Sequence, residues 1–287
     1  MMPGGTCGDS VRQDDFSIRF WGVRGSIASP GPETVRYGGN TSCIEVRCGD
    51  SLLILDAGTG LRPLGRHLLA NGRVELDLFL THTHLDHVEG LPFFQPAFDP
   101  RNVIRIWAGH LTPNGTLIDV FRKLMSPPLF PIPPDAFRAK VEFRDFECGE
   151  VMHPRPGVRM ATVALDHPGG AVGYRVEYDG RAVCYVSDTN HPGDGRVNPE
   201  IRDLVAGAEI VVYDAMFTDE EHAQRPDWGH STWREGARLC EEAGAGTLVL
   251  WHHDPIRSDD ALDAIGAEAD AARPGTLVAR EGLILHP

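Results

Sequence analysis

Three histidines and one aspartate lie close together in the segment THTHLDH, which runs from Thr81 to His87. Because alternate side chains of an extended chain point to the same face, His82 and His84 can bind one metal ion together. The chain then turns, and Asp86 and His87 project toward a neighbouring position. Imidazole nitrogens combined with a carboxylate suit zinc, with manganese and iron as alternatives. A purely structural role would have to satisfy four polar side chains at the end of a buried strand, so we predict a metal site.

One segment cannot complete a site for two metal ions, so further ligands must come from distant parts of the chain. Three other apolar runs each end in a residue that can bind a metal: VRMATVALDH ends at His167, RAVCYVSD at Asp188 and TLVLWH at His252. A layered sheet can bring such strand ends to one place. The adjacent His253 remains an alternative to His252.

The elements that must position these residues follow from hydrophobic patterning. Strands are predicted at FSIRF, at TSCIEVRC and SLLILDAG with a hairpin turn at Gly49-Asp50, at LDLFLT, at AVGYRVEY before the turn Asp179-Gly180, and at EIVVYDA. Helices are predicted from Leu61 to about Asn71-Gly72, from the capping box Thr232-x-x-Glu235 to about Gly244, and over 259–272. Because strands precede helices in both halves, we expect two sheets packed face to face with helices outside.

The domain organisation is predicted to be simple. Residues 1–14 are expected to form a flexible N-terminal tail, and residues 15–287 a single domain. Residues 92–140 contain many prolines and the aromatic residues Phe93, Phe94, Phe98 and Phe130. We predict an excursion there with one short helix near 116–125, which serves either as a lid over the site or as an interface.

Charge and hydropathy argue against several other classes of protein. The 287 residues include 27 basic and 41 acidic ones, for a net charge of −14, whereas binding of long nucleic acid calls for a positive surface. No apolar run approaches the roughly 20 residues of a membrane span, and the polar N-terminus has no hydrophobic stretch typical of a secretory signal. The six cysteines form no CxxC pair, which indicates reduced thiols and a cytoplasmic protein without membrane contact.

The predicted ligands and the segments around them resemble the metallo-β-lactamase superfamily. Besides HxHxDH, the resemblance rests on FWGVRGSIASPGPETVRYGGNTSC, LILDAGTGL, DHPGGAVGYRV, VSDT, and GHST followed by LVLWHH. It extends from about Phe20 to Trp251. Within the superfamily the chain is similar to the phosphodiesterase branch, which includes ribonuclease Z and the phosphoribosyl cyclic phosphate phosphodiesterases.

The resemblance implies a fold and an assignment of ligands. The fold is a four-layer αβ/βα sandwich, a mixed class between α+β and α/β. One metal ion would be bound by His82, His84 and His167, and the other by Asp86, His87 and His252, with Asp188 bridging the two. Asp56 in LILDAGTG matches an aspartate near the site, and we expect it to hold a loop or a ligand histidine rather than to take part in catalysis.

The resemblance also implies which residues act on the leaving group. His230 in GHST corresponds to a histidine near the scissile phosphate, and its place before a capped helix puts it near the positive end of a dipole. Asp214 matches an acidic residue that helps to orient this histidine and that is a Glu in ribonuclease Z. We therefore predict His230, Asp214 and Asp86 as catalytic residues, Asp86 being a metal ligand as well.

These residues predict a hydrolase with two divalent metal ions, zinc first, with manganese or iron as alternatives. Two such ions lower the pKa of a bridging water, and the hydroxide then attacks the phosphorus of a phosphodiester. The stretch between His167 and Gly173 lacks the basic arm with which ribonuclease Z holds transfer RNA. We therefore expect a small substrate, a cyclic or linear nucleotide or sugar phosphodiester, with Arg24, Arg62 and Lys123 as candidates for holding a second anionic group.

Two other functions remain open at this point. One is hydrolysis of a carbonyl ester, as in a lactonase or thioesterase, which needs no histidine donor at position 230. The other is an iron-dependent redox or sensing module. Because members of the phosphodiesterase branch often pair, a homodimer is the expected assembly.

Overall fold

The computed structural model describes residues 15–70, 72–191 and 195–287. The predicted tail at 1–14 lies outside these described residues. The strands form two sheets of seven. The first has the order β14 (Ile284–Leu285), β1 (Phe16–Gly22), β2 (Cys43–Cys48), β3 (Ser51–Leu55), β4 (Glu75–Leu80), β5 (Val103–Ala108) and β6 (Lys140–Asp145). The second has the order β13 (Leu277–Val278), β12 (Thr247–Trp251), β11 (Ile210–Asp214), β10 (Arg181–Val186), β9 (Ala171–Tyr178), β8 (Arg159–Leu165) and β7 (Val151–Met152).

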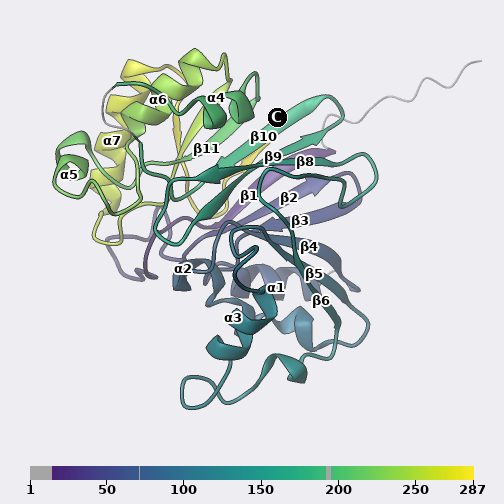
Figure 1. Ribbon diagram of the computed structural model, residues 1–287. Helices are drawn as coiled ribbons and strands as arrows, with labels where there is room; N and C mark the ends of the chain where they lie inside the picture. Colours follow the sequence, from purple (N-terminus) through teal and green to yellow (C-terminus); the bar gives the residue numbers. More distant parts are fainter. Residues whose placement is uncertain (1–14, 71, 192–194) are drawn as a thin grey trace, which may run out of the picture.

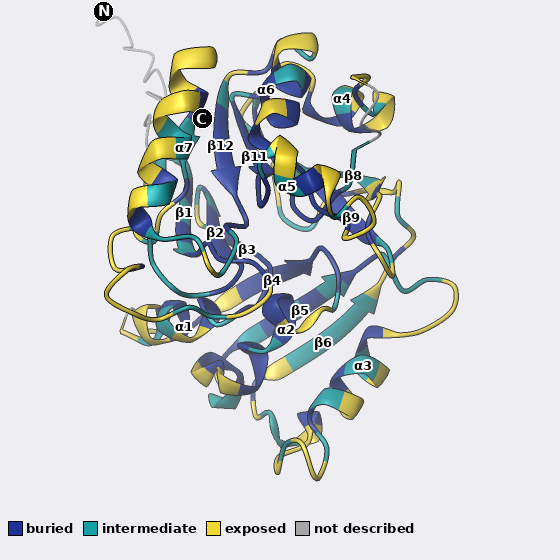
Figure 2. Cartoon of the chain, turned by 90° about the vertical axis from the view of Figure 1, so that its left-hand side faces the viewer, coloured by how far each residue is buried: buried dark blue, intermediate teal, exposed yellow. Residues whose placement is uncertain are grey.

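Helices lie on the outer side of each sheet (Figure 1). Near the first sheet are α1 (Leu61–Leu69), α2 (Leu85–Val88) and α3 (Leu117–Leu124), with the short 3-10 turns η1 (Leu91–Phe93), η2 (Gln95–Phe98) and η3 (Pro134–Ala136). Near the second sheet are α4 (Pro199–Val205), α5 (Asp219–Ala223), α6 (Trp233–Glu242) and α7 (Asp259–Ala272). The long helix α7 shows the pattern clearly, because its outward face is exposed while the neighbouring strand β12 is buried (Figure 2).

Three apolar clusters hold these layers together. The central one lies between the sheets and contains Phe20, Tyr185 and Trp251. A second joins the first sheet to α1 and α3, and a third joins the second sheet to α4, α6 and α7. Burial of apolar surface on both faces of each sheet is the main stabilising contribution in such a fold. The predicted four-layer αβ/βα sandwich is confirmed.

Strand direction decides where the predicted site residues lie. Strands β3, β4, β5 and β6 run parallel, and so do β10, β11 and β12. Because β9 is antiparallel to both β8 and β10, β8 runs in the same direction as β10. The carboxyl ends of β8, β10, β11 and β12 therefore meet at one edge of the second sheet.

Local sequence signals account for several boundaries. The turn between β9 and β10 places Asp179 and Gly180 at φ of 50° and 73°, the left-handed conformation that a two-residue hairpin turn needs. The hydroxyl of Thr232 accepts a hydrogen bond from the Glu235 N–H and begins α6. Helix α7 has the predicted bounds.

The structure differs from the prediction in part of residues 92–140. Helix α3 lies where a short helix was expected, but Val103–Ala108 forms the strand β5 inside the first sheet, between β4 and β6. Its side chains alternate between buried and half-buried positions, as the sequence VIRIWA allows. Phe94 is also fully buried. The many prolines around this strand hid it, because they lie in the loops on either side.

Among the described residues, no helix is both long and apolar enough to cross a membrane.

Candidate metal centre

The seven predicted metal ligands come together at the edge where the two sheets meet. They form two groups, and within each group the potential ligand atoms all lie within 4.8 Å of one another. The first group contains His82, His84 and His167, and the second contains Asp86, His87, Asp188 and His252. All except His84 are buried. The first sheet supplies four of them from the turn after β4 and from α2, and the second sheet supplies three from the ends of β8, β10 and β12.

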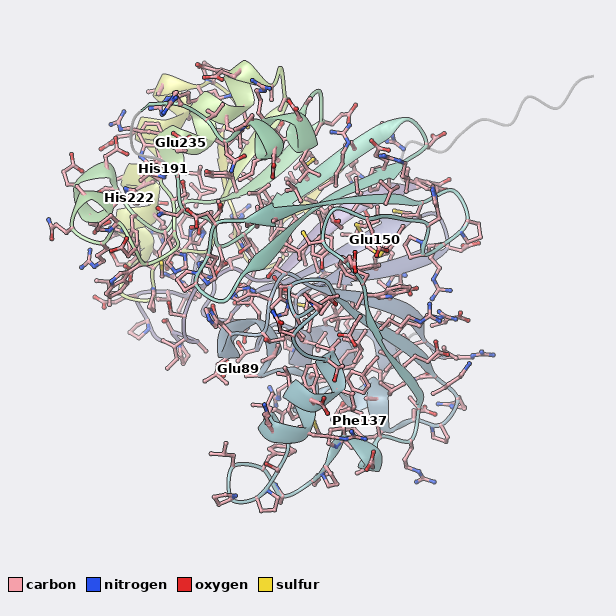
Figure 3. All side chains as sticks on the ribbon, viewed as in Figure 1. Glu89, Phe137, Glu150, His191, His222 and Glu235 are labelled. Atoms are coloured by element: carbon pink, nitrogen blue, oxygen red, sulfur yellow. The ribbon has the colours of Figure 1, made fainter. Side chains whose placement is uncertain are left out.

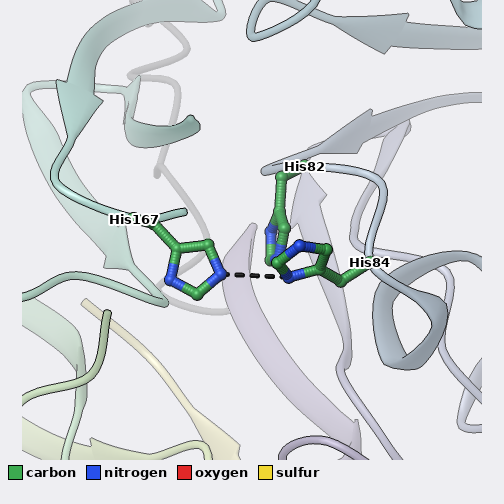
Figure 4. A group of neighbouring side chains, drawn as sticks. All are labelled: His82, His84 and His167. Atoms are coloured by element: carbon green, nitrogen blue, oxygen red, sulfur yellow. Dashed lines mark hydrogen bonds between the residues drawn. The ribbon is translucent and has the colours of Figure 1, made fainter. Parts of the chain in front are cut away.

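In the first group, three imidazole rings face one another (Figure 4). The Nε2 of His167 lies 3.0 Å from the Nδ1 of His84. The other nitrogen of His167, Nδ1, lies 2.8 Å from the carbonyl oxygen of Gly229 and donates to it, so Nε2 carries the lone pair. The Nε2 of His82 is buried without a hydrogen-bond partner. These nitrogens have the orientation of metal ligands.

In the second group, two imidazoles and two carboxylates converge. The Nε2 of His252 lies 3.1 Å from Asp86 Oδ2 and 3.2 Å from Asp188 Oδ1. The Nε2 of His87 lies 3.2 Å and 3.4 Å from the same two oxygens. The two Nε2 atoms are themselves 3.3 Å apart. Four donors around one point are the arrangement of a cation site.

Asp188 lies between the two groups. Its Oδ1 faces His87 and His252, whereas its Oδ2 lies 3.7 Å from the Nε2 of His82 and 3.9 Å from that of His167. The hydroxyl of Ser187 donates to Oδ1 at 2.5 Å, and the indole N–H of Trp251 donates to that hydroxyl at 3.2 Å. One carboxylate thus offers an oxygen to each group.

The adjacent histidines at the end of β12 point in different directions. His252 joins the second group, with a backbone φ of 60°. The Nε2 of His253 instead donates to the carbonyl oxygen of Ala279 at 2.8 Å, and its ring packs edge-on against Tyr37. Burial lowers the pKa of His253 to about 3. Of the two, only His252 reaches the site.

Contacts outside the two groups fix the ligands in place. The carboxylate of Asp56, fully buried, accepts from His87 Nδ1 at 2.8 Å, from the Thr81 N–H at 2.7 Å and from the Tyr185 hydroxyl at 2.7 Å. A proton held on Nδ1 leaves the lone pair of His87 Nε2 directed at the site. Asp56 therefore contacts a predicted ligand.

Two further contacts come from the segment after β1 and were missed from the sequence. The N–H of Ser26 donates to Asp86 Oδ2 at 2.8 Å. A Cβ on Gly25 would lie 2.4 Å from the ring of His252, so a side chain cannot fit there. In the segment VRGSIAS, only the glycine indicates that the backbone lies close to the ligands.

The electrostatics of the site suit bound cations. Burial raises the pKa of Asp86, but His87 and His252 outweigh it and hold the pKa below the usual range. Burial lowers the pKa of His82 far below its ordinary value, and the nearby His87 lowers it further, so this imidazole stays neutral. His87 differs, because burial lowers its pKa but Asp86, Asp188 and Asp56 outweigh burial and raise the pKa well above the ordinary value, so without a metal ion a proton supplies the positive charge there. Ionised carboxylates and a neutral imidazole with an orphaned nitrogen are the states in which these groups bind divalent metals. The donor set therefore fits a binuclear site.

His230 and Asp214 form a pair next to the second group. The Nδ1 of His230 lies 3.0 Å from Asp214 Oδ2, and the ring stacks on His252 with centroids 5.0 Å apart. Asp214 is fully buried and also accepts from the N–H groups of Thr189 and Met216. Burial lowers the pKa of His230, but the Asp214 carboxylate outweighs this effect and raises it to about 9. His230 is thus a cation at neutral pH, with Nε2 left for another partner.

Two histidines that the sequence gave no reason to connect support the loop of His230. His191 and His222 stack with ring centroids 4.0 Å apart (Figure 3). His191 Nδ1 lies 2.9 Å from the hydroxyl of Ser231, the residue after His230. His222 Nε2 lies 2.9 Å from the side-chain oxygen of Asn190. No sequence spacing signals this pair, because His191 lies in the loop after β10 and His222 lies in α5.

The three candidate anion-binding residues lie in different environments. Arg24 is buried and donates to the carbonyl oxygens of Gly38 and Arg257, so it serves the structure of the loops. Lys123 is exposed on α3. Arg62, exposed at the start of α1, lines a pocket near α2.

Comparison with known proteins places this geometry in a family. The model of the beta-lactamase superfamily domain matches residues 52–253. Ribonuclease Z of Haloarcula marismortui is 25% identical over 314 aligned positions, which cover 93% of this chain and 95% of that protein. Among solved structures, the metallo-beta-lactamase fold protein YhfI of Bacillus subtilis has a TM-score of 0.71 at 19% identity, covering 94% of this chain and 98% of that one. A diphosphatase from the PhnP family has a TM-score of 0.66 at 19% identity, covering 94% and 97%. The chain belongs to the metallo-β-lactamase superfamily, and over nearly its whole length it is similar to ribonuclease Z.

Proposed function

We propose that this protein is a binuclear metal-dependent phosphodiesterase that acts on a small substrate. One divalent ion would be held by His82, His84 and His167, and the other by Asp86, His87 and His252, and Asp188 offers one oxygen to each group. The observation that carries the proposal is the position of Asp188, whose two oxygens face the two groups of ligands separately. A carboxylate in that position can contact a cation in each of the two groups.

Donor chemistry favours zinc as the resident metal. The first group consists of imidazoles only, and the second adds carboxylate oxygens. Imidazole suits zinc and iron, whereas the carboxylates also suit manganese. Zinc is therefore the first choice, with manganese and iron as alternatives that metal analysis distinguishes.

Metal ions in such a pair activate a water molecule at neutral pH and draw charge from the phosphoryl oxygens. The residues of the chain then have two tasks. Asp56 and Ser187 hold His87 and Asp188 in the orientation that the site requires. His230, protonated below a pH of about 9 and held by Asp214, donates a proton to the oxygen of the leaving group.

Two arguments favour a small phosphodiester over transfer RNA. The net charge of −14 opposes binding of a long polyanion, and the short turn from His167 to β9 leaves no room for a basic arm. The relatives include ribonucleases Z as well as a diphosphatase, so both substrate sizes occur among them. The aspartate at position 214 supports a phosphodiester rather than a carbonyl ester, because it keeps a proton donor in place at His230.

Hydrolysis of bis(p-nitrophenyl) phosphate by the protein loaded with zinc, manganese or iron tests the proposal. We expect turnover with at least one metal, two ions per chain by elemental analysis, and loss of turnover in His84→Ala. His286→Ala, which changes an exposed histidine near the C-terminus, serves as the matched control. Absence of hydrolysis of this ester and of cyclic nucleotides with every metal would refute the proposal.

His230→Ala separates the proposal from its two alternatives. A carbonyl-ester hydrolase would keep nearly full activity on a lactone or thioester in this variant. A redox module would be isolated with iron and would react with oxygen or peroxide whether or not His230 is present.

A further inference from the structure

A pocket of about 560 Å³ lies between the loop that joins β1 to β2 and the segments that begin α1 and follow α2. Two of its walls continue directly from the site. Ala28 is two residues from Ser26, whose N–H holds Asp86. Glu89, labelled in Figure 3, is three residues along α2 from Asp86, an axial rise of about 4.5 Å. The pocket therefore shares two chain segments with residues of the candidate site, although none of the seven predicted ligands lines it.

The wall formed by residues 28–40 is fixed before any ligand binds. The Thr34 hydroxyl donates to the carbonyl oxygen of Ser29 at 2.6 Å, and the Arg24 guanidinium donates to that of Gly38 at 2.8 Å. The carboxylate of Glu281 accepts from the N–H of Asn40 at 2.7 Å. Since the polar groups of this loop are already tied to the body, little conformational entropy is lost when a ligand enters.

The side chains that line the pocket include exposed apolar ones, one of which, Phe93, also packs edge-on against Phe130. Val35 is 74% exposed and Phe93 is 57% exposed, and both line the pocket. The guanidinium of Arg62, the only basic side chain of the lining, has no hydrogen-bond or ion-pair partner in the described part of the chain. The carboxyl of Glu89 accepts a hydrogen bond from the Thr41 hydroxyl at 3.2 Å. The pocket thus offers an apolar wall and one unpaired cation, with the carboxyl groups of Glu89 and Glu281 elsewhere in its lining.

We infer that this pocket binds one ester group of the phosphodiester, and that this group carries a flat ring together with a second anionic group. The ring packs against Phe93 and Val35, and the anion pairs with Arg62. The volume suits a ligand of nucleotide size. Arginine forms bidentate hydrogen bonds with phosphate and carboxylate oxygens, so the second anion is recognised specifically. This inference rests on the proposed function.

Three p-nitrophenyl phosphodiesters with the same leaving group test the inference. The first is methyl p-nitrophenyl phosphate, the second is the thymidine 5′-ester, and the third is that ester with an added 3′-phosphate. We expect kcat/KM to rise about tenfold from the first to the second and about tenfold again to the third, mainly through KM. Hydrolysis of the first ester tests the proposed function alone.

Two variants should each remove one of these two increases in kcat/KM. Phe93→Ala should abolish the advantage of the thymidine ester over the methyl ester. Arg62→Ala should abolish only the further advantage of the 3′-phosphate, by about tenfold. Arg66→Ala, an exposed arginine one turn along α1 that does not line the pocket, is the matched control. If Arg62→Ala changes kcat/KM for all three esters equally, or for none, the inference is overturned.

Binding gives an answer even if no ester is hydrolysed. Calorimetry with thymidine 3′,5′-bisphosphate and the protein with its metals as isolated should show a Kd about tenfold higher in Arg62→Ala and an unchanged Kd in Arg66→Ala. That result without hydrolysis of any ester would support the pocket and refute the proposed function. Equal binding by all three proteins would overturn the inference about the pocket.

Discussion

The two sheets contribute to the metal centre in different ways. The first sheet supplies His82, His84, Asp86 and His87 from one short segment, the turn after β4 together with α2, so their relative positions depend on local chain geometry. The second sheet supplies His167, Asp188 and His252 from the ends of three strands, so their positions depend on the register of the whole sheet. The local half is visible in a short stretch of sequence, whereas the distributed half exists only in the folded sheet.

Asp188 belongs to the distributed half but faces both groups of ligands. Its substitution should therefore weaken the binding of both metal ions. We expect Asp188→Asn to lower kcat/KM by roughly a thousandfold or more and to lose both metal ions, because the amide removes the charge that faces each group. His82→Ala should lose the ion of the first group and should retain more of the second-group ion than Asp188→Asn does. Elemental analysis of both variants, with circular dichroism to confirm folding, measures the difference. Retention of two ions in Asp188→Asn would contradict the bridging position.

His230 tests whether the second sheet also supplies the proton donor. His230→Gln should lower kcat on a diester with a poor leaving group by about a hundredfold or more, with the metal content unchanged. The pKa of His230 is raised to about 9, above the ordinary value near 6.5, so the donor is present at neutral pH and is lost as pH rises through about 9. We therefore expect kcat/KM to fall above that pH in the native protein and not in the variant.

The control for this experiment is His153→Gln, which changes an exposed histidine next to β7. An ester of p-nitrophenol, which leaves without a proton, should be much less sensitive to His230→Gln than an alkyl ester. Equal losses on both esters would show that His230 acts by another route.

The same contrast explains how much the sequence revealed. The HxHxDH cluster, the apolar strands and the capping threonine are local signals, and from them the layers and the positions of the site residues at strand ends follow. The hydrogen bond from Ser26 to Asp86 and the stacked pair His191 and His222 join segments far apart in sequence. No spacing reports such contacts, because tertiary packing creates them.

The strand β5 was missed for a different reason. Its alternation of buried and half-buried residues is regular, but it is only six residues long and has proline-rich loops on both sides. The proline-rich composition of residues 92–140 therefore outweighed the short alternation of VIRIWA in the prediction. The choice between His252 and His253 needed the structure, because the sequence does not show which of two adjacent side chains at a strand end points toward the site.

Asp56 orients a ligand of the local half, and we expect a moderate effect from its loss. Asp56→Asn replaces the acceptor of the His87 Nδ1 proton, and comparable changes lower metal affinity by about 10- to 100-fold. Chelator competition measures the affinity. Asp77→Asn is a matched control, because Asp77 is also fully buried at the other end of β4, where it binds Arg155 and Trp107. That variant should lower stability and leave the metal affinity unchanged.

Ser187 orients the bridging residue of the distributed half, and its loss should have the smallest effect. Ser187→Ala removes the hydroxyl that donates to Asp188 Oδ1 and accepts from Trp251, while the rigid end of β10 keeps the carboxylate in place. We expect metal affinity to fall by about three- to tenfold, the equivalent of one neutral hydrogen bond, since no charge is lost. Ser42→Ala is the control, because that buried hydroxyl has no hydrogen-bond partner among the residues that the structure describes. If Ser187→Ala matched Asp56→Asn in its effect, the register of the second sheet alone would not hold Asp188, and the two halves of the site would depend equally on side-chain partners.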